Sequence, residues 1–388
     1  MAYARRLLEK ESARAGEYDV DRLLVELEAL SRAESGDCDV KAFSAGYRRR
    51  AECLASAFRN RDIAVAHDSS VADILRVVLA HRDACAQARS VIGTHHQQLR
   101  VDVATASEPE QAWQAAVSDA QALQTYAEAA AHTGRRSFVR DAHDWCVRTA
   151  RDFFHGSGAA DAVVKDARRL HFKKHGARLP PEAEAELREA AQVATRAALA
   201  GAHIKVLDIG SCHDPWRLES TDFDVVALDL QPAAKEVYRC DFLTLDIGTC
   251  MQFDPPQHAA DGAGRLHSLP ASSFHVAVLS LVLSYIPDPL ARCRMIALAR
   301  RLLHDTAGLL LIVTPISTNA GFTPQRQLPV LKEWNEAIGS LGFERHAYDR
   351  LRTVHVMAYR KVPAPLEAVP LKPLRIAYDE RATRDAAS

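Results

Sequence analysis

The sequence lacks the features that would place the chain across a membrane or direct it out of the cell. No uninterrupted apolar run reaches about 18 residues, the shortest length that indicates a membrane span. Near its start the chain carries charges at Arg5, Arg6 and Glu9 in place of an apolar secretion signal. We therefore expect a protein without a membrane span that works in the cytoplasm.

The sequence also lacks an excess of charge of either sign. Lys and Arg number 49, and Asp and Glu number 50, so no overall field draws the protein to nucleic acid or membrane. Local basic patches remain compatible with this balance, and the best candidate is the segment 165–178. Such a run either contacts phosphates or forms the solvated face of a helix, and both readings stay open here.

The cysteines lack the spacing of a disulfide framework or a metal site. The chain has eight cysteines, and none of them forms a C-x-x-C pair. Scattered cysteines of this kind are typical of reduced thiols in the cytosol or nucleus. No metal site is predicted.

A last absence concerns glycine. Gly210 follows the apolar segment 204–209 and is itself followed by Ser-Cys-His-Asp-Pro-Trp, without the other glycines of G-x-G-x-x-G. That motif receives the pyrophosphate of a dinucleotide at a helix N-terminus. A nicotinamide dinucleotide is therefore disfavoured. S-adenosylmethionine (SAM) has no phosphate and does not need that motif.

The sequence pattern changes near residue 200. Residues 1–180 are Ala-rich and predict an all-α helical domain, because apolar residues recur with helical spacing. One such stripe consists of Val71, Ile74, Leu75, Val78 and Leu79. Residues 181–362 alternate strands and helices, which predicts an α/β, Rossmann-like domain. Proline and charge dominate residues 363–388 and predict a disordered tail.

Seven strands are predicted within the α/β part. They are 204–209, 224–228, 237–240, 274–281, 308–314, 343–348 and 353–359, the last two as an antiparallel hairpin. Helices are expected at 181–199, 290–303 and 324–341. Residues 246–268 show no periodicity and predict a surface insertion. This seven-strand layout is the usual form of SAM-dependent methyltransferases.

Three positions in this layout favour an adenosine-bearing ligand. Gly210 lets the chain turn with positive φ and lets a ligand approach closely. Asp229 ends the second strand 19 positions later (229 − 210 = 19), where a carboxylate can accept from ribose hydroxyls. Asp241 and Phe242 suit the amino group and the face of an adenine. The alternatives are an ordinary turn at the glycine and helix caps at the aspartates.

Together, the motifs resemble the Bmt-two-like methyltransferase family. The resemblance rests on DIGSC, ALDLQPA, VYRCDFL, SLVLSYIPDP and GLLLIVTP. It covers roughly residues 200–360 strongly and the helical half more loosely. Animal members of this family include a SAM sensor upstream of the TOR kinase complex, and fungal members methylate N1 of an adenine in large-subunit ribosomal RNA.

The resemblance implies a ligand and a set of binding residues. The family's glycine falls on Gly210, its ribose-binding acid on Asp229, and the methionine part of SAM is expected beside Ser280–Ser284. SAM is the implied cofactor, with S-adenosylhomocysteine as a competing ligand, and no catalytic residue is assigned. The expected cofactor-binding residues are Asp208, Gly210, Ser211, Asp229, Leu230, Asp241, Phe242, Ser280 and Leu281.

A sensor and an enzyme both fit the resemblance. A sensor is expected to lose binding to subunits of the GATOR and KICSTOR complexes when SAM is bound, and to reach the lysosome surface through them. An enzyme would methylate ribosomal RNA in the nucleolus, with Tyr285 stacking on a base. The favoured alternative is that Tyr285 packs against the next helix and Asp288 caps it. Since no general base is evident, the sensor is favoured.

Overall fold

The computed structural model describes residues 71–134, 137–219, 221–255, 264–315, 324–363, 370–376 and 379. The first 70 residues of the predicted all-α domain therefore lie outside the described part. Contacts divide the chain into two units: Met1–Ile92 with His132–Arg140, and Gly93–Ala131 with Asp141–Ser388. The predicted boundary at residue 180 differs from this division, because the helices that precede it pack in the same unit as the sheet.

The described part of the first unit is helical. It comprises the start of α4 (Val71–Thr105), the last residues of α6 (Ala120–Gly134) and the first residues of α7 (Ser137–His155). Helix α4 is 35 residues long, and the stripe predicted at residues 71–79 lies within it. The prediction of helix is confirmed for this stretch.

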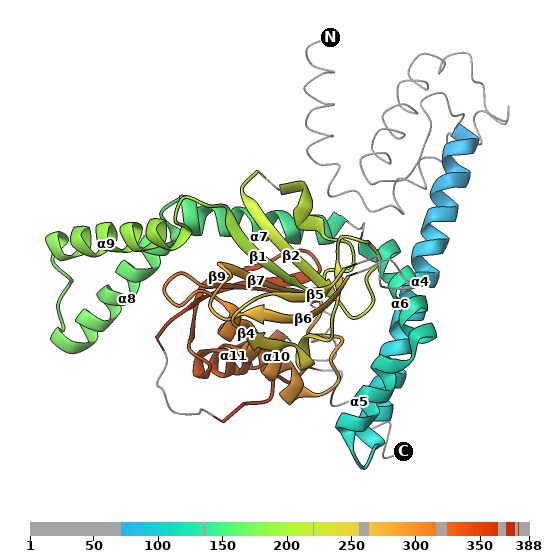
Figure 1. Cartoon of the computed structure of the whole chain (residues 1–388). Helices are drawn as coiled ribbons and strands as arrows, with labels where there is room; N and C mark the ends of the chain where they lie inside the picture. The colour runs from blue at the N-terminus through green and yellow to red at the C-terminus, as the bar shows by residue number, and fades with distance from the viewer. Residues whose placement is uncertain are drawn as a thin grey trace, which may run out of the picture. The chain divides into compact units, whose positions relative to one another are not determined.

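Three further helices of the second unit precede the sheet. They are α5 (Pro109–Ser118), α8 (Gly158–His175) and α9 (Pro181–Leu199). Helices α8 and α9 form a hairpin (Figure 1) that the ion pairs Arg188–Asp161 and Arg168–Glu184 hold together. Helix α7 lies against the sheet and buries one apolar stripe, which consists of Ala142, Cys146, Val147, Ala150 and Phe153.

The strands of the second unit form one sheet. They are β1 (Ile204–Ile209), β2 (Phe223–Asp229), β3 (Tyr238–Arg239), β4 (Asp246–Gly248), β5 (Gln252–Asp254), β6 (Arg265–Pro270), β7 (Val276–Ser280), β8 (Leu309–Pro315), β9 (Phe343–Arg350) and β10 (Val354–Lys361). Their order is β4-β6-β3-β2-β1-β7-β8-β10-β9, and β5 pairs with β6. Strand β10 runs antiparallel to both of its neighbours. The seven predicted strands occur, and the order β3-β2-β1-β7-β8-β10-β9 confirms the predicted fold class.

The surface insertion predicted at residues 246–268 is wrong in part. Strands β4, β5 and the start of β6 lie in this segment and extend the sheet beyond β3. Sequence periodicity could not reveal β4 and β5, because each is three residues long and mostly exposed. A strand that buries neither face leaves no alternation of apolar and polar residues.

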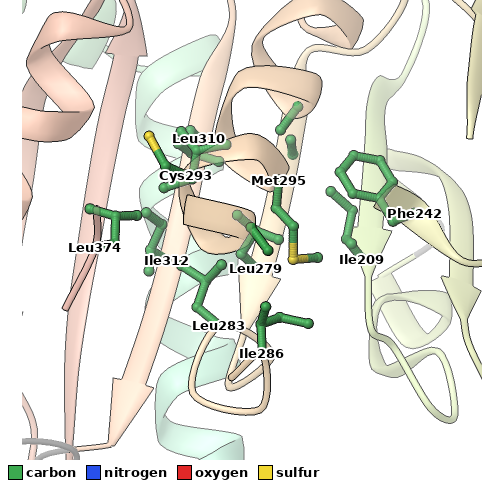
Figure 2. Close-up of a cluster of buried hydrophobic side chains, with 14 of the residues drawn as sticks. Ile209, Phe242, Leu279, Leu283, Ile286, Cys293, Met295, Leu310, Ile312 and Leu374 are labelled. Atoms are coloured by element: carbon green, nitrogen blue, oxygen red, sulfur yellow. The ribbon is translucent and has the colours of Figure 1, made fainter. Parts of the chain in front are cut away.

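The core lies between the central strands and two helices. Strands β1, β7 and β8 are buried almost throughout, which suits a parallel sheet covered on both faces. Helices α10 (Pro289–Leu302) and α11 (Pro324–Ser340) lie on the face opposite α7 (Figure 1). Figure 2 shows Cys293 and Met295 of α10 among Leu279 of β7 and Ile312 of β8.

The prediction of a disordered tail is wrong for residues 370–376. Leu374 and Ile376 are buried in the hydrophobic core, and the indole N–H of Trp334 donates to the carbonyl of Arg375 at 2.8 Å. The segment contains alternating apolar residues that the prolines and charges around them obscured. We call residues 370–379 the C-terminal strap.

Candidate ligand site at the carboxyl edge of the sheet

The candidate site lies where the order of the strands reverses. Strand β1 has β2 on one side and β7 on the other, so the chain leaves the sheet in opposite directions from this point. In open α/β sheets, ligands bind in the crevice outside the carboxyl ends of such strands. The loops that follow β1, β2, β3 and β7 therefore define the region in which to look for a ligand.

The loop after β1 is held from below by a buried carboxyl group. Ser211 Oγ donates to Asp208 at 2.7 Å and accepts from the main-chain N–H of Asp214 at 3.1 Å. Asp208 is 2% exposed, and this burial raises its pKa to about 7, although the bond from Ser211 acts in the opposite direction. Asp208 and Ser211 thus order the loop from inside the protein.

Gly210 occupies a position that other residues would strain. Its φ is 74°, and a Cβ added there would lie 2.8 Å from a methyl carbon of Val282. Both observations require glycine. The structure therefore gives a reason for Gly210 that differs from the predicted close approach of a ligand, because the atom that excludes a side chain belongs to the loop after β7.

The carboxylate of Asp229 ties two loops together. It accepts the main-chain N–H of Cys212 at 3.0 Å and that of Gln231 at 2.9 Å. Loss of solvation raises the pKa of Asp229 to about 6, and the two main-chain hydrogen bonds limit this rise. Leu230, the next predicted contact, packs against the hydrophobic core. The loops after β1 and β2 are thus fixed relative to each other by one acid.

Asp241 and Phe242 have structural partners of their own. The carboxylate of Asp241 caps the short helix η3 (Phe242–Thr244) by accepting the N–H of Leu243 at 3.0 Å. Phe242 is 3% exposed and lies in the core near Ile209 (Figure 2). Phe242 thus packs in the hydrophobic core, and its stacking on a purine stays a prediction.

The loop after β7 has an unusual backbone. Ser280 ends the strand, and Leu281 follows with a φ of 62°, in the left-handed region that branched side chains rarely adopt. Hydrogen bonds hold it there: its N–H donates to Val313 at 2.9 Å, and its carbonyl accepts from Ser284 Oγ at 3.0 Å. Strain of this kind persists only where its surroundings enforce it, and it often occurs beside a functional site.

The acid and the arginine that follow this loop have structural roles. Asp288 caps α10 through the N–H groups of Leu290 and Ala291, at 2.9 and 3.0 Å. Arg292 has no exposed surface, donates to main-chain carbonyls of the loop and the strap, and pairs with Asp379 at 2.7 Å. The capping alternative for Asp288 is therefore confirmed, and Arg292 is a buried residue that joins the loop to the strap.

Sequence reasoning missed three helical residues that meet the loop after β7: His96, Arg100 and Tyr126. The rings of His96 on α4 and Tyr126 on α6 surround Tyr285, with centroid distances of 4.1 Å (His96–Tyr285) and 5.6 Å (Tyr126–Tyr285). Burial raises the pKa of Tyr126 well above its usual value, and a hydrogen bond to Tyr285 and the charge of Asp229 act in the same direction. Tyr285 therefore packs against the preceding helices α4 and α6.

Polar contacts join the same helices to the candidate site. The guanidinium of Arg100 donates to the carbonyl of Ser284, and Gln124 accepts from the side-chain amide of Gln231 at 2.8 Å. Among the described residues, the buried polar atoms without a hydrogen-bond partner include Nε2 of His96 and Oε1 of Gln231. Nothing in the sequence indicated these contacts, which join residues more than 100 positions apart.

The basic segment 165–178 is only partly available to a ligand. Arg168 pairs with Glu184, and Arg169 pairs with Glu344 at 3.0 Å and with Asp166 at 3.5 Å. These ion pairs lie at the surface and fit the solvated-helix interpretation. As for membranes, no helix among the described residues has both the length and the apolar composition of a span.

The strand order and the loops at its reversal define a Rossmann-type domain with the SAM-dependent methyltransferase fold. A family model described as "25S rRNA (adenine(2142)-N(1))-methyltransferase, Bmt2" matches residues 266–365. Among solved structures, a 16S rRNA (adenine(1408)-N(1))-methyltransferase from Catenulisporales acidiphilia is 15% identical, over 49% of this chain and 94% of that one. Its TM-score of 0.29 is too low to support any argument.

Curated relatives give the family. The "S-adenosylmethionine sensor upstream of mTORC1" of Danio rerio is 31% identical over 286 residues, which are 70% of this chain and 69% of that protein. The Xenopus tropicalis protein of the same name is 34% identical over 285 residues, 70% of this chain and 68% of that protein. The chain belongs to the family of S-adenosylmethionine sensors upstream of mTORC1, as predicted.

Proposed function

We propose that this protein binds SAM at the carboxyl edge of the sheet and reports its level to the TOR pathway. The observation that carries the proposal is the Asp229 carboxylate, held by two loop amides at the reversal point of a sheet in a chain of this family. A carboxylate has about four acceptor sites, so these two bonds leave acceptor capacity for ribose hydroxyls. S-adenosylhomocysteine shares this nucleoside and is expected to compete.

The remaining parts of the ligand have candidate contacts as well. A SAM molecule with its ribose at Asp229 and its methionine beside Ser280 and Leu281 would pass the rings of Tyr126 and Tyr285. The unpartnered buried Nε2 of His96 and Oε1 of Gln231 lie among the contacts that surround these rings, and polar groups of the ligand would satisfy them. On this proposal, the helices α4 and α6 form part of the pocket wall.

A sensor needs only a ligand-dependent change in its affinity for a partner. The contacts of α4 and α6 with the loop after β7 would be strengthened when a ligand fills the space beside them. Partners that bind the alternative arrangement would then bind less well, with a coupling of about 1–3 kcal/mol. The GATOR and KICSTOR complexes are the proposed partners, and the cytoplasm, including the lysosome surface, is the proposed location.

Substitution of the ribose-binding acid tests the proposal. Asp229→Ala should weaken SAM binding about 100-fold, because two charge-assisted hydrogen bonds of about 1.5 kcal/mol each are lost. Titration calorimetry with the full chain measures this. Asp224→Ala is the matched control, because Asp224 is exposed on the same strand and should bind SAM like the wild type. Equal SAM affinity of Asp229→Ala and wild type would contradict the assignment of Asp229 as the residue that binds the ribose.

The sensor and the enzyme are separated by two further measurements on the same preparation. If the protein is a sensor, SAM should reduce its capture of GATOR or KICSTOR subunits for the wild type but not for Asp229→Ala. The alternative is favoured only by the match of residues 266–365 to a ribosomal RNA methyltransferase model. SAM-dependent methyl transfer to an adenine of total RNA would establish that alternative.

A further inference from the structure

A second pocket lies away from the carboxyl edge, between helix α8, helix α11 and strand β9. It has a volume of about 630 Å³. Its β9 lining is the continuous run from Phe343 to Tyr348. Side chains of a strand alternate between the two faces of the sheet, so a pocket on one face would touch every second residue. A pocket that touches six in a row runs along the edge of the strand.

That edge is open. Strand β9 is the last strand in the sheet order and pairs only with β10, which lies on its inner side. Its outer N–H and C=O groups therefore have no strand partner in the described part of the chain. An unpaired edge of eight residues is a template for a further strand unless something covers it. In this pocket, the edge faces one side of α8, formed by Asp161, Lys165 and Arg169, while Asn335 and Gly339 of α11 complete the lining.

The charges along this pocket are unbalanced. Its three acids are engaged by arginines: Asp161 with Arg188, and Asp166 and Glu344 with Arg169 and Arg360. Two exposed cations remain, Lys165 on α8 and Arg345 on β9.

Neither of these cations makes a salt bridge with a described residue. Arg345 instead lies over the ring of Tyr348, at 5.7 Å from its centroid. His346 adds no charge near neutral pH, because burial lowers its pKa. The pocket therefore carries surplus positive charge. This charge lies on both of its walls, at Lys165 on α8 and at Arg345 on β9.

We propose that the groove between α8 and the open edge of β9 binds an extended acidic peptide segment of a protein partner. The segment would add to β9 as a further strand, and its carboxylates would pair with Lys165 and Arg345. Main-chain hydrogen bonds supply affinity in this mode of recognition, and side chains that fit the flanking groups supply specificity. This surface is separate from the SAM site, so the inference does not depend on SAM binding.

The probe for this groove is a synthetic peptide in which eight residues alternate glutamate and valine, with a fluorescent label. Binding to the full-length protein is measured by anisotropy, and a peptide that alternates lysine and valine is the matched control. The acidic peptide should bind at least about tenfold more tightly than the basic one. Equal binding of the two peptides would overturn the proposal, as would binding of an RNA oligonucleotide with no binding of either peptide.

Charge reversal locates the binding surface. Lys165→Glu combined with Arg345→Glu should weaken the acidic peptide about tenfold, and both residues are exposed, so the fold should be retained. Lys173→Glu is the control, because Lys173 is exposed on the same helix and does not line the groove. An equal loss in the control and the double variant would show that net charge, and not this groove, binds the peptide.

Hydrogen exchange tests whether the peptide adds a strand. Bound peptide should slow exchange of main-chain amides within 343–350, because those that point outward become hydrogen-bonded. The wild-type protein with the basic peptide is the reference. Binding of the acidic peptide without added protection in β9 would overturn strand addition and with it the proposal.

Discussion

At the residue scale, the site depends on two acids, Asp208 and Asp229, whose charged forms are destabilised by burial. Asp208 and Asp229 lie beneath and beside the loop after β1, and burial raises the pKa of both, to about 7 and about 6. A protein would not keep two such groups for stability alone, since a buried carboxylate opposes folding. Each instead accepts hydrogen bonds that set the position of a loop amide or hydroxyl group. The acids therefore preorganise the site at the expense of stability.

The raised pKa of Asp208 predicts a pH dependence of stability. Between about pH 4 and pH 7 the folded protein binds more protons at this carboxyl group than the unfolded chain does, so its contribution falls as pH rises, by up to about 1.4 kcal/mol per unit. Asp208→Asn removes this contribution and keeps an acceptor for Ser211. Urea unfolding across this range should show the variant gaining stability relative to the wild type as pH rises. A constant difference would contradict the assignment.

At the element scale, the loop after β7 is held by side chains from two helices. Arg100 of α4 donates to one of its carbonyls, and Arg292 of α10 donates to those of Leu283 and Ile286 at 3.1 and 2.8 Å. The loop also contains Leu281 in the left-handed conformation. It is therefore positioned by groups from two helices, and Tyr285 is presented by a rigid segment.

Removal of Arg292 should destabilise this arrangement. Arg292→Leu removes the ion pair with Asp379 and the hydrogen bonds that Arg292 donates to buried carbonyls. Breaking a buried ion pair by removing one partner typically costs about 3–5 kcal/mol, which urea unfolding can measure. Arg294→Leu is the matched control: Arg294 is on the same helix, its side chain is 44% exposed, and its loss should cost less than about 1 kcal/mol. Equal effects of the two variants would refute the role given to Arg292.

At the scale of the whole molecule, segments far apart in the sequence meet around one sheet. Residues from α4, α6 and the C-terminal strap all reach the neighbourhood of the loop after β7. The strap contributes two fully buried apolar side chains, Leu374 and Ile376. It therefore behaves as part of the α/β domain.

Truncation tests the contribution of the strap. A chain that ends at residue 362 loses the burial of Leu374 and Ile376, about 1.5–3 kcal/mol each before the cost of ordering the segment. We expect a net loss of about 2–4 kcal/mol in thermal or urea unfolding. A chain that ends at residue 379 keeps both side chains and the partner of Arg292, and it should match the full-length protein. Indistinguishable stability of the two truncations would show that the strap does not stabilise the domain.

Much of the fold could be predicted from local sequence pattern. Strands β1, β2, β7 and β8 are apolar runs because a central parallel strand is buried on both faces. The antiparallel hairpin of β9 and β10 was also predicted, although β9 is an edge strand and only partly buried. Short strands at the sheet edge and the buried strap escaped prediction, because their pattern is too brief or is mixed with proline and charge.

The candidate site was predictable only for residues that follow strands. Asp229 stands out because its spacing from Gly210 repeats a known arrangement. His96, Arg100 and Tyr126 lie on helices in which nothing distinguishes them from surface residues, and only tertiary contacts bring them to Tyr285. The burial of Phe242 was not predictable, because an aromatic residue after a strand can face either a ligand or the core.

Arg292 contacts two separate segments, and this has a practical consequence for studies of the protein. One guanidinium contacts both the loop that presents Tyr285 and the last described residues of the chain. An affinity tag fused directly after residue 376 would replace Asp379 and remove the ion pair of Arg292, which also contacts the loop after β7. Capture assays that compare partner binding should therefore place the tag after residue 388, beyond a flexible linker.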